Sequence, residues 1–294
     1  MTYIIENANL IKQNRLIKAS LLVDNEKILS VQPEFAKYRY MKMNADKFYM
    51  SATDVFYQNG LPKMEPMFKE KNYFIQQFLL RGCTTILVSA NVTYLHELDE
   101  KIEEVREFYQ KGPLDFTIGV KIPIQIFTVP FIQKCKREKI PAIFIEFNDV
   151  RDLYKIPWGW IREALFPYNC PLIPVVHGEE SVKKKLLQTW VTILQREKIP
   201  HIEHPLQEMS KLSLSVLKKI GIYPLKGYLQ AGGELSYNLY IQKGDIKEKS
   251  QQSIDNLQLV ITVHKGEVIR VDKKIYYNQK KGSELIIKRP SFFQ

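Results

Sequence analysis

Three side chains of the types that bind zinc stand at or just beyond the ends of short apolar runs. Glu146 follows the run AIFI, His177 closes PLIPVVH, and His204 lies just beyond PHIE. Three such ligands hold zinc and leave a fourth position for a water molecule. Strand alternation puts His201 on the opposite face from His204, so His201 is the alternative ligand in that segment. The interpretation that we favour is simpler, namely that neighbouring polar groups satisfy these histidines and a hydrogen bond satisfies Glu146.

The elements that must position these residues show up as apolar runs of strand length separated by helical stretches. This alternation is typical of repeated β–α units on a parallel sheet. The predicted strands are 48–55, 84–89, 116–122, 142–147, 172–177 and 200–203. The predicted helices are 68–81, 95–110, 131–138, 158–165, 180–196 and 206–219.

Both ends of the chain have a different pattern, with short alternating runs typical of antiparallel strands. Such runs occupy the first thirty residues and return after residue 220, as in LQLVITV at 257–263. The economical architecture is an α/β domain at 48–220 inserted into a composite β-sandwich domain built from 1–47 and 221–294. Two independent β pieces are the alternative.

Composition places the chain among ordinary globular proteins. Apolar residues make up 45% of its 294 residues and charged residues 26%. Neither a secretory leader nor a run of membrane-spanning length is present, and the three cysteines are widely separated. We therefore expect a cytoplasmic protein with reduced thiols and no membrane partner.

The net charge of +11 raises the question of an anionic partner. The basic clusters at 134–139, 183–185 and 280–281 lie in separate segments without interleaved aromatic residues. We interpret them as solvated faces and do not expect a nucleic-acid partner; binding of an anion or a nucleic acid is the weakest of three functional hypotheses.

Several segments, taken in order, resemble the amidohydrolase superfamily, which includes dihydroorotases, hydantoinases and deaminases. They are LLVDNEKILSVQP at 21–33, GCTTILVSAN at 82–91, PLIPVVHGEE at 171–180, HIEH at 201–204 and GIYPLKGYLQAGGELSYNL at 221–239. The resemblance implies a TIM-like barrel with its site at the carboxyl ends of the strands, plus a composite β-sandwich. It also implies hydrolysis of C–N bonds in cyclic amides or related compounds by a metal-activated water.

The sequence departs from that family at positions the chemistry needs. The family's first strand ends in Asp-x-His-x-His, and alignment on Asp54 puts Phe56 and Gln58 at the two histidine positions. Phenylalanine cannot bind a metal, and an amide is a poor zinc ligand. The helix at 206–219 leads almost directly into the C-terminal β segments. Two barrel units and the aspartate that transfers protons are therefore missing.

These departures predict an incomplete TIM-like barrel of about six units that has lost catalysis. We expect a binding, regulatory or scaffold protein without a cofactor. The alternative is a metal-dependent hydrolase of C–N bonds with one zinc on Glu146, His177 and His204. An incomplete barrel also exposes two sheet edges, so we expect a helix, the β domain or a second copy in a homodimer to cover them.

Overall fold

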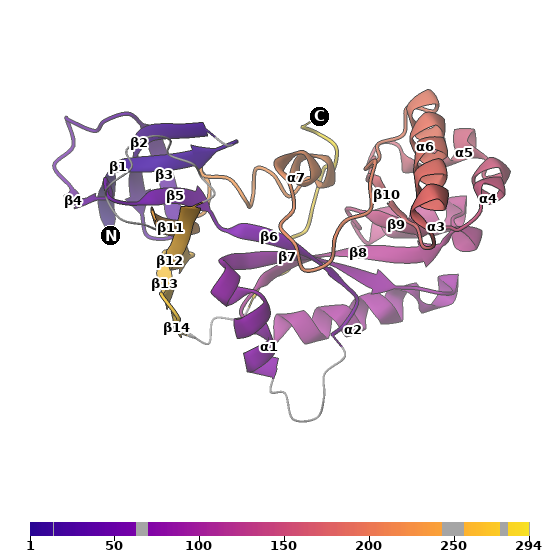
Figure 1. Ribbon diagram of the computed structural model, residues 1–294, viewed down its shortest axis with the longest axis horizontal. Coiled ribbons are helices and arrows are strands. Elements are labelled where there is room, and N and C mark those ends of the chain that lie inside the picture. Colours follow the sequence, from indigo (N-terminus) through magenta and orange to yellow (C-terminus); the bar gives the residue numbers. More distant parts are fainter. Residues whose placement is uncertain (14, 63–69, 243–255, 277–281, 294) are drawn as a thin grey trace. The chain divides into compact units, whose positions relative to one another are not determined.

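The computed structural model describes residues 1–13, 15–62, 70–242, 256–276 and 282–293 (Figure 1). Contacts divide the described residues into two compact units. We call them the β unit, within Met1–Asp54, Lys69–Thr84 and Pro224–Gln279, and the barrel unit, within Val55–Phe68, Thr85–Tyr223 and Lys280–Gln294. The predicted boundaries put 69–84 in the barrel domain and 280–294 in the β domain. Their described parts lie instead in the β unit and in the barrel unit, respectively.

The barrel unit contains a five-stranded sheet in the order β10-β9-β8-β7-β6. Its strands are β6 (Asp54–Asn59), β7 (Cys83–Asn91), β8 (Asp115–Pro123), β9 (Ile143–Glu146) and β10 (Leu172–Val175). The neighbouring pairs from β7 to β10 are parallel, as the predicted β–α units require. The predicted sixth strand is reduced to one bridge, in which His201 pairs with Leu172 of β10.

One face of this sheet is concave, and we call it the inner face. The ring of Tyr57 on β6 stacks on Phe144 of β9 at 4.8 Å between centroids, although two strands lie between them in the sheet order. Such a contact requires the sheet to curl. Register places Ile173 beside Phe144, and Leu87 joins the same buried cluster, so both belong to the inner face.

Helix α7 (Leu214–Ile220) packs on the inner face through Val216, Leu217 and Ile220. The outer face is covered by other helices, as the contacts of Tyr109 with Phe116 and of Trp190 with Phe147 show. The remaining helices of the unit are α2 (Leu98–Gln110), α3 (Val129–Arg137), α4 (Val150–Lys155), α5 (Trp158–Leu165) and α6 (Glu180–Arg196), with 3-10 turns at Leu95–Glu97 and Ile124–Ile126.

The predicted helix at 206–219 is wrong in its first half. The helix begins only at Leu214, where the Ser213 hydroxyl accepts a hydrogen bond from the backbone N–H of Val216. Serine is a strong N-cap residue, because its oxygen satisfies an N–H that has no partner inside the helix. The preceding residues take a different course, along the edge of the sheet.

Both edges of the curled sheet are covered by one irregular segment of the same chain. At β10, the N–H of Ile202 donates to the carbonyl of Leu172 at 2.8 Å. At β6, the N–H groups of Met209 and Leu212 donate to the carbonyls of Tyr57 and Val55, each at 2.8 Å. The prediction named a helix, the β domain or a second copy as the cover, whereas the chain uses residues 200–212.

The β unit is a nine-stranded sheet in the order β14-β13-β12-β11-β5-β1-β2-β3, with β4 beside β1. Its strands are β1 (Thr2–Lys12), β2 (Arg15–Asp24), β3 (Lys27–Gln32), β4 (Met41–Asn44), β5 (Tyr49–Ala52), β11 (Tyr237–Gln242), β12 (Leu257–His264), β13 (Glu267–Val271) and β14 (Lys274–Ile275). The unit also holds α1 (Glu70–Gln77) and a 3-10 turn at Leu79–Arg81. Because β11 pairs with β5, strands from both ends of the chain share one sheet, which confirms the composite β domain.

Together the two sheets confirm the predicted fold class, an incomplete TIM-like barrel with a β domain built from both termini. None of the described helices has the length and apolarity needed to cross a bilayer.

Candidate functional site

Three charged or titratable side chains meet where neighbouring strands of the inner face end. The Nε2 atom of His177 lies 2.9 Å from Oε1 of Glu146, and Nζ of Lys121 lies 3.4 Å from Oε2 of the same carboxylate. Lys121 comes from β8, Glu146 ends β9, and His177 follows β10. The Lys121 side chain is only 17% exposed, against 59% for His177. Glu146 is therefore a carboxylate held between a cation and an imidazole.

The structure brings two of the predicted ligands together and leaves the third apart. His204 is exposed and lies within the segment 200–212 that covers the sheet edges. Among the described residues, Glu146, His177 and His204 do not bring their ligand atoms within 4.8 Å of one another. The alternative ligand, His201, bonds through Nδ1 to the carbonyl of Ile199 at 2.8 Å. Burial lowers the pKa of His201, so the neutral ring is favoured there.

Phe56 and Gln58 occupy the opposite face of β6 from Tyr57. Side chains alternate along a strand, and Tyr57 is fixed on the inner face by its stack on Phe144. Both Phe56 and Gln58 are buried, and the Gln58 amide donates to the carboxylate of Glu208 at 3.0 Å. Neither side chain faces the Glu146 carboxylate.

Tyr57 fills the inner face near the site. Its side chain is 4% exposed, and its hydroxyl lies 3.2 Å from Oγ of Ser89. Burial raises the pKa of Tyr57 to about 12, so the phenol stays protonated. The aromatic ring and Phe144 belong to the packed cluster on the inner face.

The donor set does not fit the metal site that the amidohydrolase resemblance implies. The two first-strand positions hold a phenylalanine and an amide that both lie on the other face of the sheet. Glu146 has its two oxygens engaged by His177 and Lys121. A lysine cation beside the carboxylate opposes a second cation there, because like charges in a partly buried site repel.

A shallow depression of about 610 Å³ lies between the segment that follows β9 and the first turns of α6. Its lining residues are Asn148, Asp149, Val150, Arg151, Ser181, Val182, Lys185 and Leu186. Asp149 caps α4 and pairs with the Arg151 guanidinium at 2.6 Å. Arg151 lowers the pKa of Asp149 through that hydrogen bond. The lining therefore offers a carboxylate, two cationic side chains and an amide to a small polar ligand.

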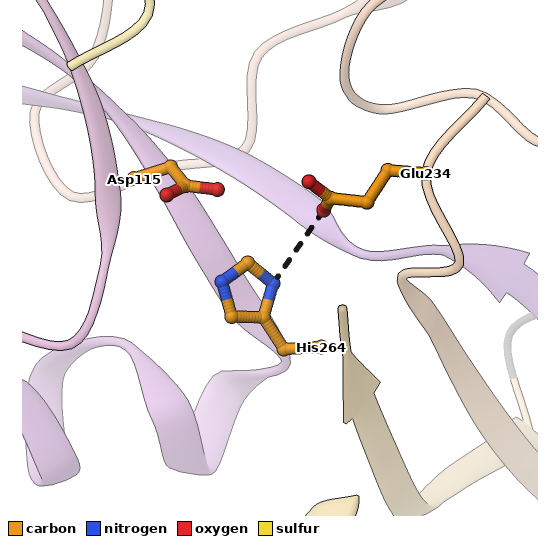
Figure 2. Close-up of side chains that lie close together, drawn as sticks. All are labelled: Asp115, Glu234 and His264. Carbon is orange, nitrogen blue, oxygen red and sulfur yellow. Dashed lines mark ion pairs between the residues drawn. The ribbon is translucent and has the colours of Figure 1, made fainter. Parts of the chain in front are cut away.

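The β unit holds a polar cluster that was not predicted from sequence (Figure 2). Glu234 accepts from Lys226 at 2.7 Å and lies 3.8 Å from Nδ1 of His264. The Ser236 hydroxyl bonds to Glu234 and lies 3.2 Å from the same Nδ1. A serine hydrolase relay needs its serine and carboxylate on different imidazole nitrogens, so this arrangement is a structural network.

Sequence reasoning found Glu146 and His177 but missed Lys121. The available signal was its place near the end of the run FTIGVKI, on the strand before Glu146. Sequence reasoning could not supply the register that sets Lys121 beside Phe144 on the inner face.

Comparisons with known proteins identify the fold. No family model and no curated protein matches the sequence. Among solved structures, dihydropyrimidinase from Brevibacillus agri NCHU1002 matches with a TM-score of 0.61 at 13% identity, covering 100% of both chains. A D-hydantoinase from Thermus sp. matches at 0.64 and 11%, covering 99% of this chain and 100% of the other. An adenine deaminase matches at 0.55 and 11%, covering 91% and 99%. The chain therefore has the fold of the amidohydrolase superfamily, as its resemblance to hydantoinases and deaminases led us to expect.

Proposed function

We propose that this chain is an amidohydrolase-fold protein that has lost catalysis and acts as a binding, regulatory or scaffold protein. The observation that carries the proposal is the state of Glu146, whose carboxylate is engaged by His177 at 2.9 Å and Lys121 at 3.4 Å. Hydrolysis by this fold depends on a water that a metal activates. The strand-end residues here pair with one another through Glu146.

The inner face gives independent support. Tyr57 and Phe144 stack across it, and α7 packs against the same cluster. Near-attack geometry requires that the substrate be held within about 3–3.5 Å of the attacking atom. Aromatic and aliphatic side chains are packed over the inner face. A ligand therefore has better access to the depression beside β9 and α6 than to the inner face.

A metal-dependent hydrolase of C–N bonds is the alternative function. The observation that favours it is the adjacency of an imidazole and a carboxylate at the carboxyl ends of neighbouring strands. For this function, Lys121 would have to leave the carboxylate and His204 would have to approach it.

An assay of hydrolysis separates the two functions. Hydantoin and a dihydropyrimidine, the compound classes named for the similar structures, would be incubated with the chain in added Zn²⁺ or Mn²⁺. We expect turnover equal to that of the Glu146→Gln and His177→Ala variants, and equal to the buffer blank. Turnover by the unmodified chain that both variants lose would contradict the proposal.

A further inference from the structure

Residues 37–42 of the β unit, with the sequence KYRYMK, form a surface that the proposed function does not use. Every residue from 36 to 44 is exposed. Tyr38 and Tyr40 each expose 44% of their surface, which is unusual for two aromatic side chains so close in sequence. We call 37–42 the aromatic–basic segment.

The segment is held in place at both ends. Before it, Phe35 is buried against Ile4 and Leu22, and its ring meets that of Tyr38 edge-on at 5.6 Å. After it, β4 pairs in parallel with β1, so that Met41 lies opposite Tyr3. The two tyrosines are therefore presented by anchored backbone.

The two tyrosine rings stack on each other. Tyr38 and Tyr40 lie 6.0 Å apart between centroids, with 25° between their planes. Offset parallel rings of this kind are a favourable aromatic arrangement, and a further flat ring can extend them. Nucleobases stack on exposed aromatic side chains in this way whatever their sequence.

The charges beside the rings are positive. Neither Lys37 nor Arg39 forms an ion pair with any carboxylate in the described part of the chain. Lys42 bonds to Glu6 at 2.6 Å. The segment contains three cations and no carboxylate. Cations that alternate with aromatic rings can contact phosphates while the rings stack on bases.

We propose that the aromatic–basic segment binds single-stranded nucleic acid without strong sequence preference. Tyr38 and Tyr40 stack on unpaired bases, and Lys37 and Arg39 contact the adjacent phosphates. The expectation against a nucleic-acid partner rests on three basic clusters elsewhere in the chain, and this segment is not one of them. The proposal is independent of the lost catalysis, so the failure of either leaves the other intact.

An anionic membrane surface fits the segment less well. Loops that insert at a bilayer surface present bulky apolar side chains such as Trp, Phe and Leu beside their basic residues. Here Phe35 is buried, at 2% exposure. The exposed side chains beside Met41 and Met43 are tyrosines, which carry polar hydroxyls. Stacked rings with polar edges suit bases better than acyl chains.

The test measures fluorescence anisotropy of labelled oligo-dT and oligo-U with the full chain, at several salt concentrations. We expect binding that the Tyr38→Ala/Tyr40→Ala variant weakens at least about tenfold. The Lys37→Gln/Arg39→Gln variant should lower the slope of log K against log salt by about 1.4, the loss of two phosphate contacts to a single strand. A base-paired duplex of equal length should bind more weakly, because its bases are not free to stack.

Matched controls lie in the barrel unit. Tyr154→Ala/Trp160→Ala removes two exposed aromatic rings, and Lys288→Gln/Arg289→Gln removes two exposed charges. Both should bind like the unmodified chain. The proposal is overturned if no oligonucleotide binds, if duplex binds as well as single strands, or if controls and segment variants weaken binding equally. Binding only to phosphatidylserine vesicles would also overturn it.

Discussion

Tyr57 joins three strands of the inner face through one side chain. Its ring stacks on Phe144 of β9 and its hydroxyl meets Ser89 of β7. Burying a phenol is favourable only if its oxygen finds a partner, and Ser89 provides one. The residue is therefore a packing residue of the inner face.

Substitution of Tyr57 separates its two contributions. Tyr57→Phe keeps the ring and loses the hydrogen bond, so the free energy of unfolding should fall by about 1 kcal/mol. Tyr57→Ala also removes the stacked ring and leaves a cavity, and should cost about 3–5 kcal/mol. Urea denaturation measures both values. Equal effects of the two variants would show that the ring does not pack as described.

The half-buried His201 predicts how stability depends on pH. Its pKa is lowered by burial from the ordinary value of 6.5, so the unfolded chain binds this proton more readily. The stabilisation is present above that ordinary value and is lost as the pH falls below it. His201→Gln should therefore reduce the loss of stability between about pH 7.5 and about pH 5.5.

The unmodified chain is the reference for this variant. Thermal unfolding at each pH gives the comparison, and an unchanged pH dependence in His201→Gln would contradict the assignment.

At the residue scale, sequence predicted part of the site. Glu146 and His177 were recognisable because each follows an apolar run whose strand end faces the site. Lys121 was not, because its contact depends on the register between β8 and β9, and register is set by packing across the whole sheet. Alternation along β6 puts Phe56 and Tyr57 on opposite faces, but only the stack of Tyr57 on Phe144 shows that Tyr57 has the inner one.

Helix α7 packs on the inner face of this incomplete barrel. It starts at the Ser213 cap and ends at Gly221, whose φ of +88° is a left-handed conformation. A Cβ at Gly221 would lie 2.8 Å from Cγ2 of Ile287 and 3.1 Å from the carbonyl of Arg289. The C-terminal segment is thus packed against the end of this helix.

A pair of glycine substitutions tests that end of α7. Gly221→Ala should lower the free energy of unfolding by more than about 1 kcal/mol, because alanine is strained at positive φ. Gly159→Ala is the matched control, since it lies within α5 with no atom within 4 Å of the added Cβ. It should be neutral or stabilise by up to about 1 kcal/mol. Chemical denaturation that ranks the variants in the reverse order would refute this account of α7.

At the element scale, long periodic segments were predicted well and irregular ones were not. The strands from β7 to β10 are apolar runs, since buried parallel strands carry apolar side chains on both faces. The predicted strand 48–55 is instead divided between β5 of the β unit and the start of β6. The sixth strand became a single bridge and the last helix lost its first half. Residues 200–212 follow the sheet edges through backbone hydrogen bonds, which leave no side-chain periodicity to read.

At the scale of the whole molecule, several segments that resemble the family in the same order along the chain were enough to predict the fold. The low overall sequence identity did not prevent this prediction. The similar structures share at most 13% identity among the three described, yet the alignments span nearly the whole chain. The homodimer stays a prediction, and the reason from open edges has weakened because residues 200–212 cover them. Fold and function have thus to be argued separately.

The central claim is that the strand-end residues no longer hold a catalytic metal, and metal content tests it most directly. The chain would be produced in medium supplied with zinc, manganese and iron, purified without chelators and analysed by plasma mass spectrometry. We predict well below one metal per chain, and the same trace amounts in the His177→Ala/His204→Ala variant. One equivalent of any of these metals, lost in that variant, would contradict the account.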